Sequence, residues 1–290
     1  MRLSRPDADI FVPSGEPLAS ALKRATILGV AAHPDDLECM AYEPILRGFR
    51  APREAFAGLV LTSGSGSVRA GAYKGLTDKA MARVRQKEQR KAAVIGDYAV
   101  MVQLGHPSSA VLDPAASSPV DDMEAVLRAV RPREIYTHEL ADRHPTHVGV
   151  ALKLVAAIRR LPKSLRPAKL VGCEVWRSLD WLSGRNKVLM RVDGHEPLGD
   201  ALLGAFGSQL SAKRYDQGAR GRRRANAVFS DSHAGGGGGQ MLLGMDLTPL
   251  IKDDKLSPQA LLSRYLASFQ AEVLGRLGRL GGAPKRGVKP

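Results

Sequence analysis

Short apolar runs alternate with longer segments of helical periodicity over the first 160 residues of the chain. Apolar runs of strand length occupy residues 26–32, 55–62, 98–104 and 133–137. Between them, apolar side chains recur at the spacing of helices that bury one face. This alternation predicts parallel strands joined by right-handed helical crossovers, with helices on both faces of the sheet. The sequence therefore predicts an α/β fold with a Rossmann-like, mostly parallel sheet.

The strongest helix prediction runs from the capping residue Thr77 to Ile95, with an apolar stripe along its length. Further helices are predicted at residues 18–24, 120–130, 197–210, 213–228 and 257–280, and further strands at residues 169–176 and 187–192. The first strand ends without the glycine-rich turn of dinucleotide-binding folds, so a Rossmann dinucleotide-binding role is not predicted.

The chain shows no boundary with an apolar core on each side. We therefore expect a single domain over residues 1–290, with a core at about 26–230 and a C-terminal extension at 231–290. The five glycines at residues 235–239 predict a flexible linker. His233, just before them, lies either near a functional site or within that linker.

Polar side chains follow directly after the first predicted strand, in the run Ala-His-Pro-Asp-Asp. The histidine is His33, and the two carboxylates are Asp35 and Asp36. Open parallel sheets bind ligands at the C-terminal ends of their strands, and imidazole and carboxylate are ordinary zinc ligands. If Asp36 turns toward a metal beside His33, Asp35 is free to act as a base. The alternative is that the two acids cap a helix and offset its dipole.

A second cluster follows the fourth predicted strand and holds three of the seven histidines, His138, His144 and His147. Its context repeats that of the first cluster, because a strand ends there and a helix begins. Two such strand exits side by side would complete a three-ligand site with an open position, as a catalytic zinc requires. The alternative is a set of unrelated surface histidines.

Taken together, the Ala-His-Pro-Asp-Asp and His-Pro-Thr-His motifs make the chain resemble the LmbE-like or PIG-L family. Its members are zinc-dependent hydrolases that remove acetyl groups from N-acetylglucosamine-type substrates. The resemblance implies that His33, Asp36 and His147 bind Zn²⁺ or another divalent metal such as Fe²⁺. It implies Asp35 as the general base for a metal-activated water. It gives His144 the role of stabilising or protonating the tetrahedral intermediate.

The second motif departs from the family pattern at one position. The family usually reads His-Pro-Asp-His, and Thr146 stands where that Asp is common. The Asp is expected to keep the first histidine of the motif charged and oriented. The tuning of His144 is therefore open, unless another carboxylate, such as Glu139 or Asp142, substitutes.

Three further residues are candidates for binding substrate. Arg85 lies in an Arg-x-x-Glu pattern that family members carry, and the resemblance gives it a sugar-hydroxyl or phosphate contact; its spacing to Glu88 also suits an intrahelical ion pair. Ser63 begins a small-residue loop after the second strand, and Arg143 belongs to an Asp-Arg-His-Pro form similar to that of bacillithiol-type deacetylases. His106, after the third strand, either lines the pocket or caps a turn.

Basic residues outnumber acidic ones by 43 to 29, which gives a net charge of +14 and favours anionic partners. Much of this charge lies in one basic cluster, made of Lys213, Arg214, Arg220, Arg222, Arg223 and Arg224. Aromatic residues do not alternate with the basic ones, so dedicated nucleic-acid binding is not predicted. A basic binding protein that keeps the fold without catalysis is one alternative function. A metal-dependent hydrolase of a non-sugar amide or ester is another.

The two cysteines, Cys39 and Cys173, show no pairing pattern, and the N-terminus does not resemble a signal peptide. Both features predict a cytoplasmic location. No apolar run approaches the roughly 18 residues that a membrane span needs. We therefore expect a carbon–nitrogen hydrolase with a small acetylated amino-sugar substrate, and the sequence is compatible with a homo-oligomer.

Overall fold

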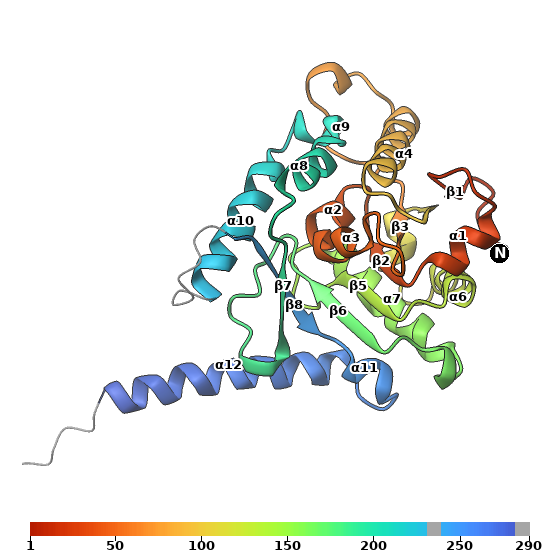
Figure 1. The fold of residues 1–290 in the computed structure, drawn as a ribbon. Coiled ribbons are helices and arrows are strands. Elements are labelled where there is room, and N and C mark those ends of the chain that lie inside the picture. The colour runs from red at the N-terminus through yellow and green to blue at the C-terminus, as the bar shows by residue number, and fades with distance from the viewer. Residues whose placement is uncertain (231–238, 282–290) are drawn as a thin grey trace, which may run out of the picture.

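A computed structural model describes residues 1–230 and 239–281 of the chain (Figure 1). The strands are β1 (Asp9–Phe11), β2 (Ile27–Ala31), β3 (Phe56–Thr62), β4 (Val100–His106), β5 (Glu134–His138), β6 (Lys169–Cys173), β7 (Lys187–Arg191) and β8 (Met241–Asp246). Within the described residues they form one eight-stranded sheet in the order β1-β4-β3-β2-β5-β6-β8-β7. The central strands β4, β3, β2, β5 and β6 are parallel, whereas β1 and β8 run antiparallel to their neighbours.

Helices cover both faces of this sheet, which confirms the predicted α/β class (Figure 1). They are α1 (Leu18–Arg24), α2 (Asp36–Met40), α3 (Tyr42–Gly48), α4 (Asp78–Ile95), α5 (Ser108–Leu112), α6 (Ser118–Val130), α7 (Pro145–Arg160), α8 (Glu196–Gly204), α9 (Gly207–Leu210), α10 (Tyr215–Ser230), α11 (Pro249–Lys252) and α12 (Pro258–Leu280), with short 3₁₀ helices at Gly71–Tyr73, Lys163–Leu165 and Gly184–Asn186. The hydroxyl of Thr77 accepts a hydrogen bond from the Ala80 N–H, as predicted for the cap of α4.

The central strand β2 shows why the sheet has two cores. Its side chains alternate between the faces, so Leu28 and Val30 join the core beneath α6 and α7. Ile27 and Ala31 point the other way and join the core beneath α2 and α3. Because both faces are covered, the strand is apolar throughout, and its sequence shows a continuous run without polar alternation.

The structure extends the sheet beyond the core range 26–230 that the sequence suggested. The arm before α1 contributes β1, which pairs with β4 over only three residues and is too short to show a period. The segment after α10 contributes β8, which lies between β6 and β7. Its strand character depends on these distant partners, and the sequence analysis did not predict it. His233 and most of the glycine run at 235–239 lie outside the described residues.

Two predicted elements are shorter than expected. The helix expected at 197–210 is interrupted, because the buried Phe206 turns into the core between α8 and α9. The strand expected at 169–176 ends at Cys173. The next residue, Glu174, bends the chain by accepting a hydrogen bond from the Leu179 N–H at 3.1 Å.

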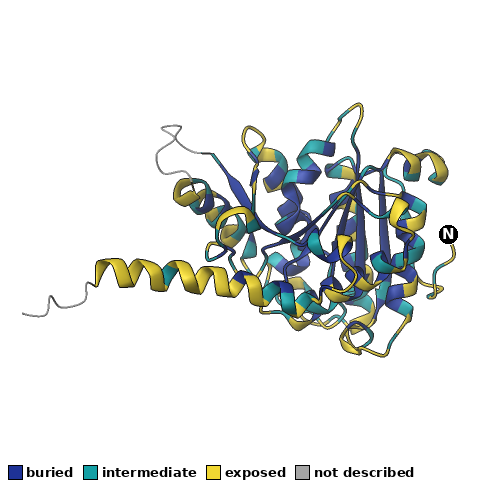
Figure 2. Cartoon of the chain, turned by 90° about the horizontal axis from the view of Figure 1, so that it is seen from below, coloured by how far each residue is buried: buried dark blue, intermediate teal, exposed yellow. Residues whose placement is uncertain are grey.

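The helix α12 runs past the body of the protein and is exposed over most of its length (Figure 2). No helix in residues 1–230 and 239–281 combines the length and apolar character that a membrane crossing requires. Both cysteines are free thiols. The single-domain organisation, the cytoplasmic location and any homo-oligomer stay predictions.

The basic cluster contributes to the fold itself. Arg223 is buried, donates hydrogen bonds to the carbonyls of Glu38 at 2.7 Å and Cys39 at 3.3 Å, and stacks over the Tyr42 ring. It therefore satisfies carbonyls at the C-terminal end of α2. Three other members form ion pairs on the surface, namely Arg214 with Asp216, Arg220 with Asp200 and Arg224 with Glu196. Much of the cluster is thus engaged within the chain and is not free for an anionic partner.

We expect Arg223→Ala to lower the free energy of unfolding by about 2–4 kcal/mol, because it leaves two carbonyls unsatisfied and removes buried packing. The neighbouring Arg224→Ala should cost less than about 1 kcal/mol, since its ion pair is exposed. Urea unfolding of both variants checks the difference. Equal losses would contradict the structural role assigned to Arg223.

Candidate metal centre

The two histidine motifs meet at the point where the strand order of the sheet reverses. From β2 the chain continues to β3 and β4 on one side, and from β5 it continues to β6 on the other. Strands β2 and β5 are hydrogen-bonded neighbours. Their C-terminal ends therefore border the crevice in which open α/β sheets bind ligands. This places the residues after β2 beside those after β5, as the sequence predicted.

His33, Asp36 and His147 offer ligand atoms that all lie within 4.8 Å of one another. The Oδ2 atom of Asp36 is 3.2 Å from His33 Nδ1 and 3.4 Å from His147 Nε2. Both ring nitrogens of His147 are buried without a hydrogen-bond partner among the described residues. A buried polar atom is costly unless it finds a partner, so the three residues fit a divalent metal. Although burial opposes ionisation, the neighbouring imidazoles hold the pKa of Asp36 well below its usual value.

His138 supports this centre from behind. Its Nε2 accepts a hydrogen bond from the Ala32 N–H at 2.9 Å, so that nitrogen's lone pair is already engaged. Its ring stacks on His147, with centroids 3.8 Å apart. Burial lowers the pKa of His138 to about 4, which leaves it neutral. The residue therefore ties the end of β2 to the second motif.

Asp142 lies beside His147. Its Oδ1 atom is 3.5 Å from His147 Nδ1, and its carboxylate accepts hydrogen bonds from the backbone N–H groups of His144 and Trp176. A carboxylate behind a metal-binding histidine orients the ring and raises its basicity. The sequence analysis offered Asp142 as a carboxylate that could replace the missing Asp at position 146 and tune His144. Asp142 instead contacts the His147 ring and only the backbone N–H of His144. Glu139 accepts from the Ala141 N–H, and no contact between it and His144 occurs in the described part of the chain.

His144 packs between the other imidazoles at the pocket wall. Its ring centroid lies 4.9 Å from that of His33 and 4.6 Å from that of His147. Burial, together with the positive charge that these neighbours carry when protonated, lowers the pKa of His144 to about 4. His144 is thus neutral near pH 7, which differs from the charged state expected when a carboxylate contacts this ring.

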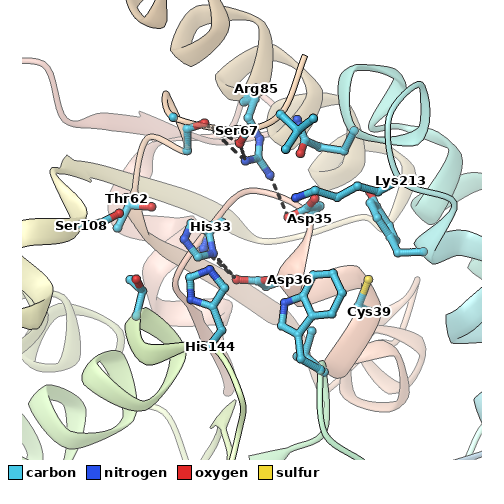
Figure 3. A pocket seen from close by; sticks show the side chains of 18 of the residues that line it. His33, Asp35, Asp36, Cys39, Thr62, Ser67, Arg85, Ser108, His144 and Lys213 are labelled. Carbon is cyan, nitrogen blue, oxygen red and sulfur yellow. Dashed lines mark hydrogen bonds and ion pairs between the residues drawn. The ribbon is translucent and has the colours of Figure 1, made fainter. Parts of the chain in front are cut away.

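Asp35 occupies the other side of the centre, as the N-cap residue directly before α2 (Figure 3). Its carboxylate pairs with Arg85, at 2.8 Å from the guanidinium. Burial raises the pKa of Asp35 to about 6, although Arg85 opposes the shift. Arg85 is itself buried and also donates to the Pro34 carbonyl and the Ser67 hydroxyl. Arg85, which was predicted to bind substrate, therefore contacts the candidate base and a loop of the pocket.

The intrahelical ion pair that was the alternative for Arg85 is not formed within the described residues. Glu88 instead accepts hydrogen bonds from the N–H and the hydroxyl of Ser208, at 2.7 and 2.6 Å. The loop after β3 needs glycine at position 64, because its φ is +61° and a Cβ there would overlap the Arg85 guanidinium.

A cavity of about 530 Å³ opens in front of these residues, a volume that suits a small-molecule ligand. Of the predicted site residues, the following line it: His33, Asp35, Asp36, Ser63, Arg85 and His144. His147 is fully buried behind this wall, and Arg143 is exposed outside it. His106 also lines the cavity, and its Nε2 lies 2.9 Å from Asp122 Oδ2, so the pocket alternative for His106 is the observed one.

The sequence analysis gave no site role to Trp176, Lys213 or Tyr215, all of which line the cavity. Lys213 extends toward Asp35 and also lies over the Trp176 ring (Figure 3). The basic cluster pointed to Lys213 only as one charge among several. Nothing in the local sequence marks Trp176, which follows β6, or Tyr215, which begins α10, because only the fold brings these two segments to one cavity.

A family model described as GlcNAc-PI de-N-acetylase (PIG-L) matches residues 28–158. This part of the chain is similar to the PIG-L family. The match begins in β2 and ends in α7, so the PIG-L segment contains both metal motifs and the two strands that present them. A comparison with curated protein sequences finds no match.

Solved structures share the fold of this chain. The conserved protein TT1542 from Thermus thermophilus is 21% identical with a TM-score of 0.59, over 77% of this chain and 94% of that one. N,N'-diacetylchitobiose deacetylase from Pyrococcus horikoshii, solved with an inhibitor, is 14% identical with a TM-score of 0.57, over 80% and 88%. GalB, the 4-carboxy-2-hydroxymuconate hydratase from Pseudomonas putida, is 15% identical with a TM-score of 0.56, over 77% and 96%.

We expect His147→Ala to abolish stoichiometric metal binding, because it removes one of three ligands. Asp142→Asn should weaken binding by about 10- to 100-fold, as the loss of a supporting carboxylate does in other sites. The exposed His195→Ala serves as the control and should bind normally. Elemental analysis after dialysis against a metal buffer measures the metal content of the three variants, which should be lowest in His147→Ala and highest in His195→Ala. Full metal content in His147→Ala would contradict the assigned ligand set.

We expect Gly64→Ala to lower the free energy of unfolding by at least about 1 kcal/mol, because alanine disfavours the positive φ and crowds Arg85. Gly66→Ala, in the same loop, meets open space and should change stability by less than about 0.5 kcal/mol. Denaturant unfolding of the two proteins tests this contrast. If Gly66→Ala lowered the free energy of unfolding by the same amount, the positive φ and the contact with Arg85 would not explain the effect of Gly64→Ala.

Proposed function

We propose that the protein is a metal-dependent de-N-acetylase that hydrolyses the acetamide of an N-acetylglucosamine-type sugar or a related amide. The PIG-L match over both metal motifs carries the proposal. The His33–Asp36–His147 cluster at the switch point of the sheet supports it, as does a cavity of sugar-binding size. A deacetylase acting on N,N'-diacetylchitobiose is among the proteins with this fold.

His33, Asp36 and His147 would hold the metal, which we propose to be zinc, with Fe²⁺ as the alternative. Two imidazoles and one carboxylate are a donor set that suits these ions and leaves coordination positions for water and substrate. The bound metal would polarise the amide carbonyl and lower the pKa of a water molecule toward about 7.

Asp35 is the proposed general base. A pKa of about 6 lies near neutral pH, where a carboxyl group can both accept and return a proton. Arg85 holds its carboxylate in an ion pair at 2.8 Å. Asp35 would take the proton from the attacking water and deliver it to the leaving amine. The products are acetate and a free amino sugar.

His144 is the proposed partner of the developing oxyanion. As a neutral imidazole, it would donate a hydrogen bond from a ring N–H and would carry no full charge. A single donor of this kind contributes about 3–4 kcal/mol to transition-state stabilisation in other hydrolases. This role does not need the Asp that Thr146 replaces.

Hydration is the second candidate, because GalB shows that the same fold carries a hydratase. The PIG-L match favours hydrolysis, and the two reactions differ in whether acetate leaves. The non-catalytic alternative rests on the net charge of +14 and on Thr146. Four arginines of the basic cluster have partners within the chain, which weakens this alternative.

The test is acetate release from a panel of N-acetylglucosamine, N,N'-diacetylchitobiose and N-acetylglucosaminides, with zinc- or iron-loaded protein. We expect Asp35→Asn to keep its metal but to lose about 10²- to 10⁴-fold in kcat, because the base is removed. Asp36→Asn should lose both metal and activity. Acetate release that persists in Asp35→Asn would refute the assigned base. A metal-loaded wild type that releases no acetate from any member would refute the deacetylase.

A further inference from the structure

Asp35 has a backbone conformation that its side chain does not favour. Its φ is +97°, in the region that residues other than glycine rarely adopt. Such a conformation persists only where the surroundings impose it. The position matters because the carboxylate of a residue points where its backbone directs it. Contacts with surrounding residues must therefore maintain the positive φ of Asp35.

Two residues of α4, one helical turn apart, contact Asp35. Arg85 holds the carboxylate and the preceding Pro34 carbonyl, as described above. Gln89, four residues later on the same face of α4, accepts a hydrogen bond from the Asp35 N–H through its Oε1 at 3.1 Å. The backbone and the side chain of Asp35 are thus fixed by separate groups.

The amide of Gln89 is itself oriented by a buried carboxyl group. Its Nε2 donates to Glu38 Oε1 at 2.8 Å, and the Tyr98 hydroxyl donates to the same oxygen at 2.8 Å. Gln89, Glu38 and Tyr98 are all fully buried. Reversing the amide would set its NH₂ group against the Asp35 N–H and its oxygen against Glu38. Only one orientation therefore satisfies both ends, and it presents an acceptor to Asp35.

We infer that Gln89 is a positioning residue for Asp35, and that Glu38 and Tyr98 act by fixing the Gln89 amide. The inference rests on the proposed function where it calls Asp35 the base. Its structural half, that Gln89 maintains the positive φ of Asp35, stands without any assigned substrate. Asp35 lines the cavity, whereas Glu38 and Gln89 are not among the described residues that line it, so Gln89 reaches the cavity through its hydrogen bond to the Asp35 N–H.

The kinetic test compares Gln89→Leu with Gln103→Leu. Gln103 is also a buried glutamine, but it bonds Asp9 and the Gln86 carbonyl away from the cavity, so its loss controls for a buried amide in general. We expect Gln89→Leu to lower kcat by about 10- to 100-fold, the scale of a misplaced reacting group, with KM and metal content unchanged. Gln103→Leu should keep wild-type kcat. Equal losses of kcat in the two variants, or a change in KM alone, would overturn the inference.

A double-mutant cycle tests whether Gln89 acts through Asp35. In an Asp35→Asn background, Gln89→Leu should cause no further loss of kcat, because the group that it positions is already absent. The same fold loss in both backgrounds would overturn the inference. Tyr98→Phe removes one donor to Glu38 and leaves Gln89 in place, so it should lower kcat by only a few-fold. If Gln89→Leu folds poorly, the kcat of Tyr98→Phe is measured in its place.

A structural readout separates this inference from the proposed function. In a crystal structure of Gln89→Leu, we expect Asp35 to return to negative φ, whereas in Gln103→Leu it should keep its positive φ. If the wild type releases no acetate but Asp35 moves in Gln89→Leu, the proposed reaction fails and the positioning role survives. If Asp35 keeps its positive φ in Gln89→Leu, the positioning role is wrong whatever the substrate.

Discussion

One carboxylate oxygen organises the site. The Oδ2 atom of Asp36 faces three imidazoles, those of His33 at 3.2 Å and of His138 and His147 at 3.4 Å. These rings come from two strand exits about a hundred residues apart in the chain. A buried negative charge must be compensated, and a buried imidazole must find a partner. Each motif therefore needs the other, and the pairing of β2 with β5 brings them into reach.

Around this oxygen, burial and neighbouring charges shift the pKa values of the ionisable side chains in different directions. Burial raises the pKa of Asp35 to about 6, and burial lowers that of His144 to about 4. Asp36, in contact with imidazoles, stays ionised. The pKa values of these adjacent carboxylates thus shift in opposite directions, because the imidazoles outweigh burial at Asp36, whereas burial outweighs the opposing Arg85 at Asp35. Such a separation is what distinguishes acid–base groups from ligands in other sites.

The sequence was sufficient for the parallel strands and for the two motifs, because apolar runs of strand length and the letters around His33 and His147 are local signals. It could not place Asp142 or Gln89, whose roles depend on contacts across the fold. It also treated Arg223 as one member of a charged cluster, although this side chain is buried over Tyr42. Net charge describes the whole chain, and only packing decides which charges remain at the surface. The strand β8 was missed although Met241–Met245 is an apolar run of strand length, because the sequence analysis assigned the segment after residue 230 to an extension outside the core.

The position of β8 has a consequence for the order in which the protein can be assembled. Strand β7 is made before β8 but pairs with it and not with β6, and β6 uses β8 as its outer neighbour. During synthesis, β7 therefore has no partner in the sheet until residues 241–246 have left the ribosome. The strands that carry the histidines, β2 and β5, have already been synthesised by then. The residues of the metal centre are thus made before the strand that contributes Leu242 to the cavity wall, so the cavity cannot be complete until β8 has been synthesised.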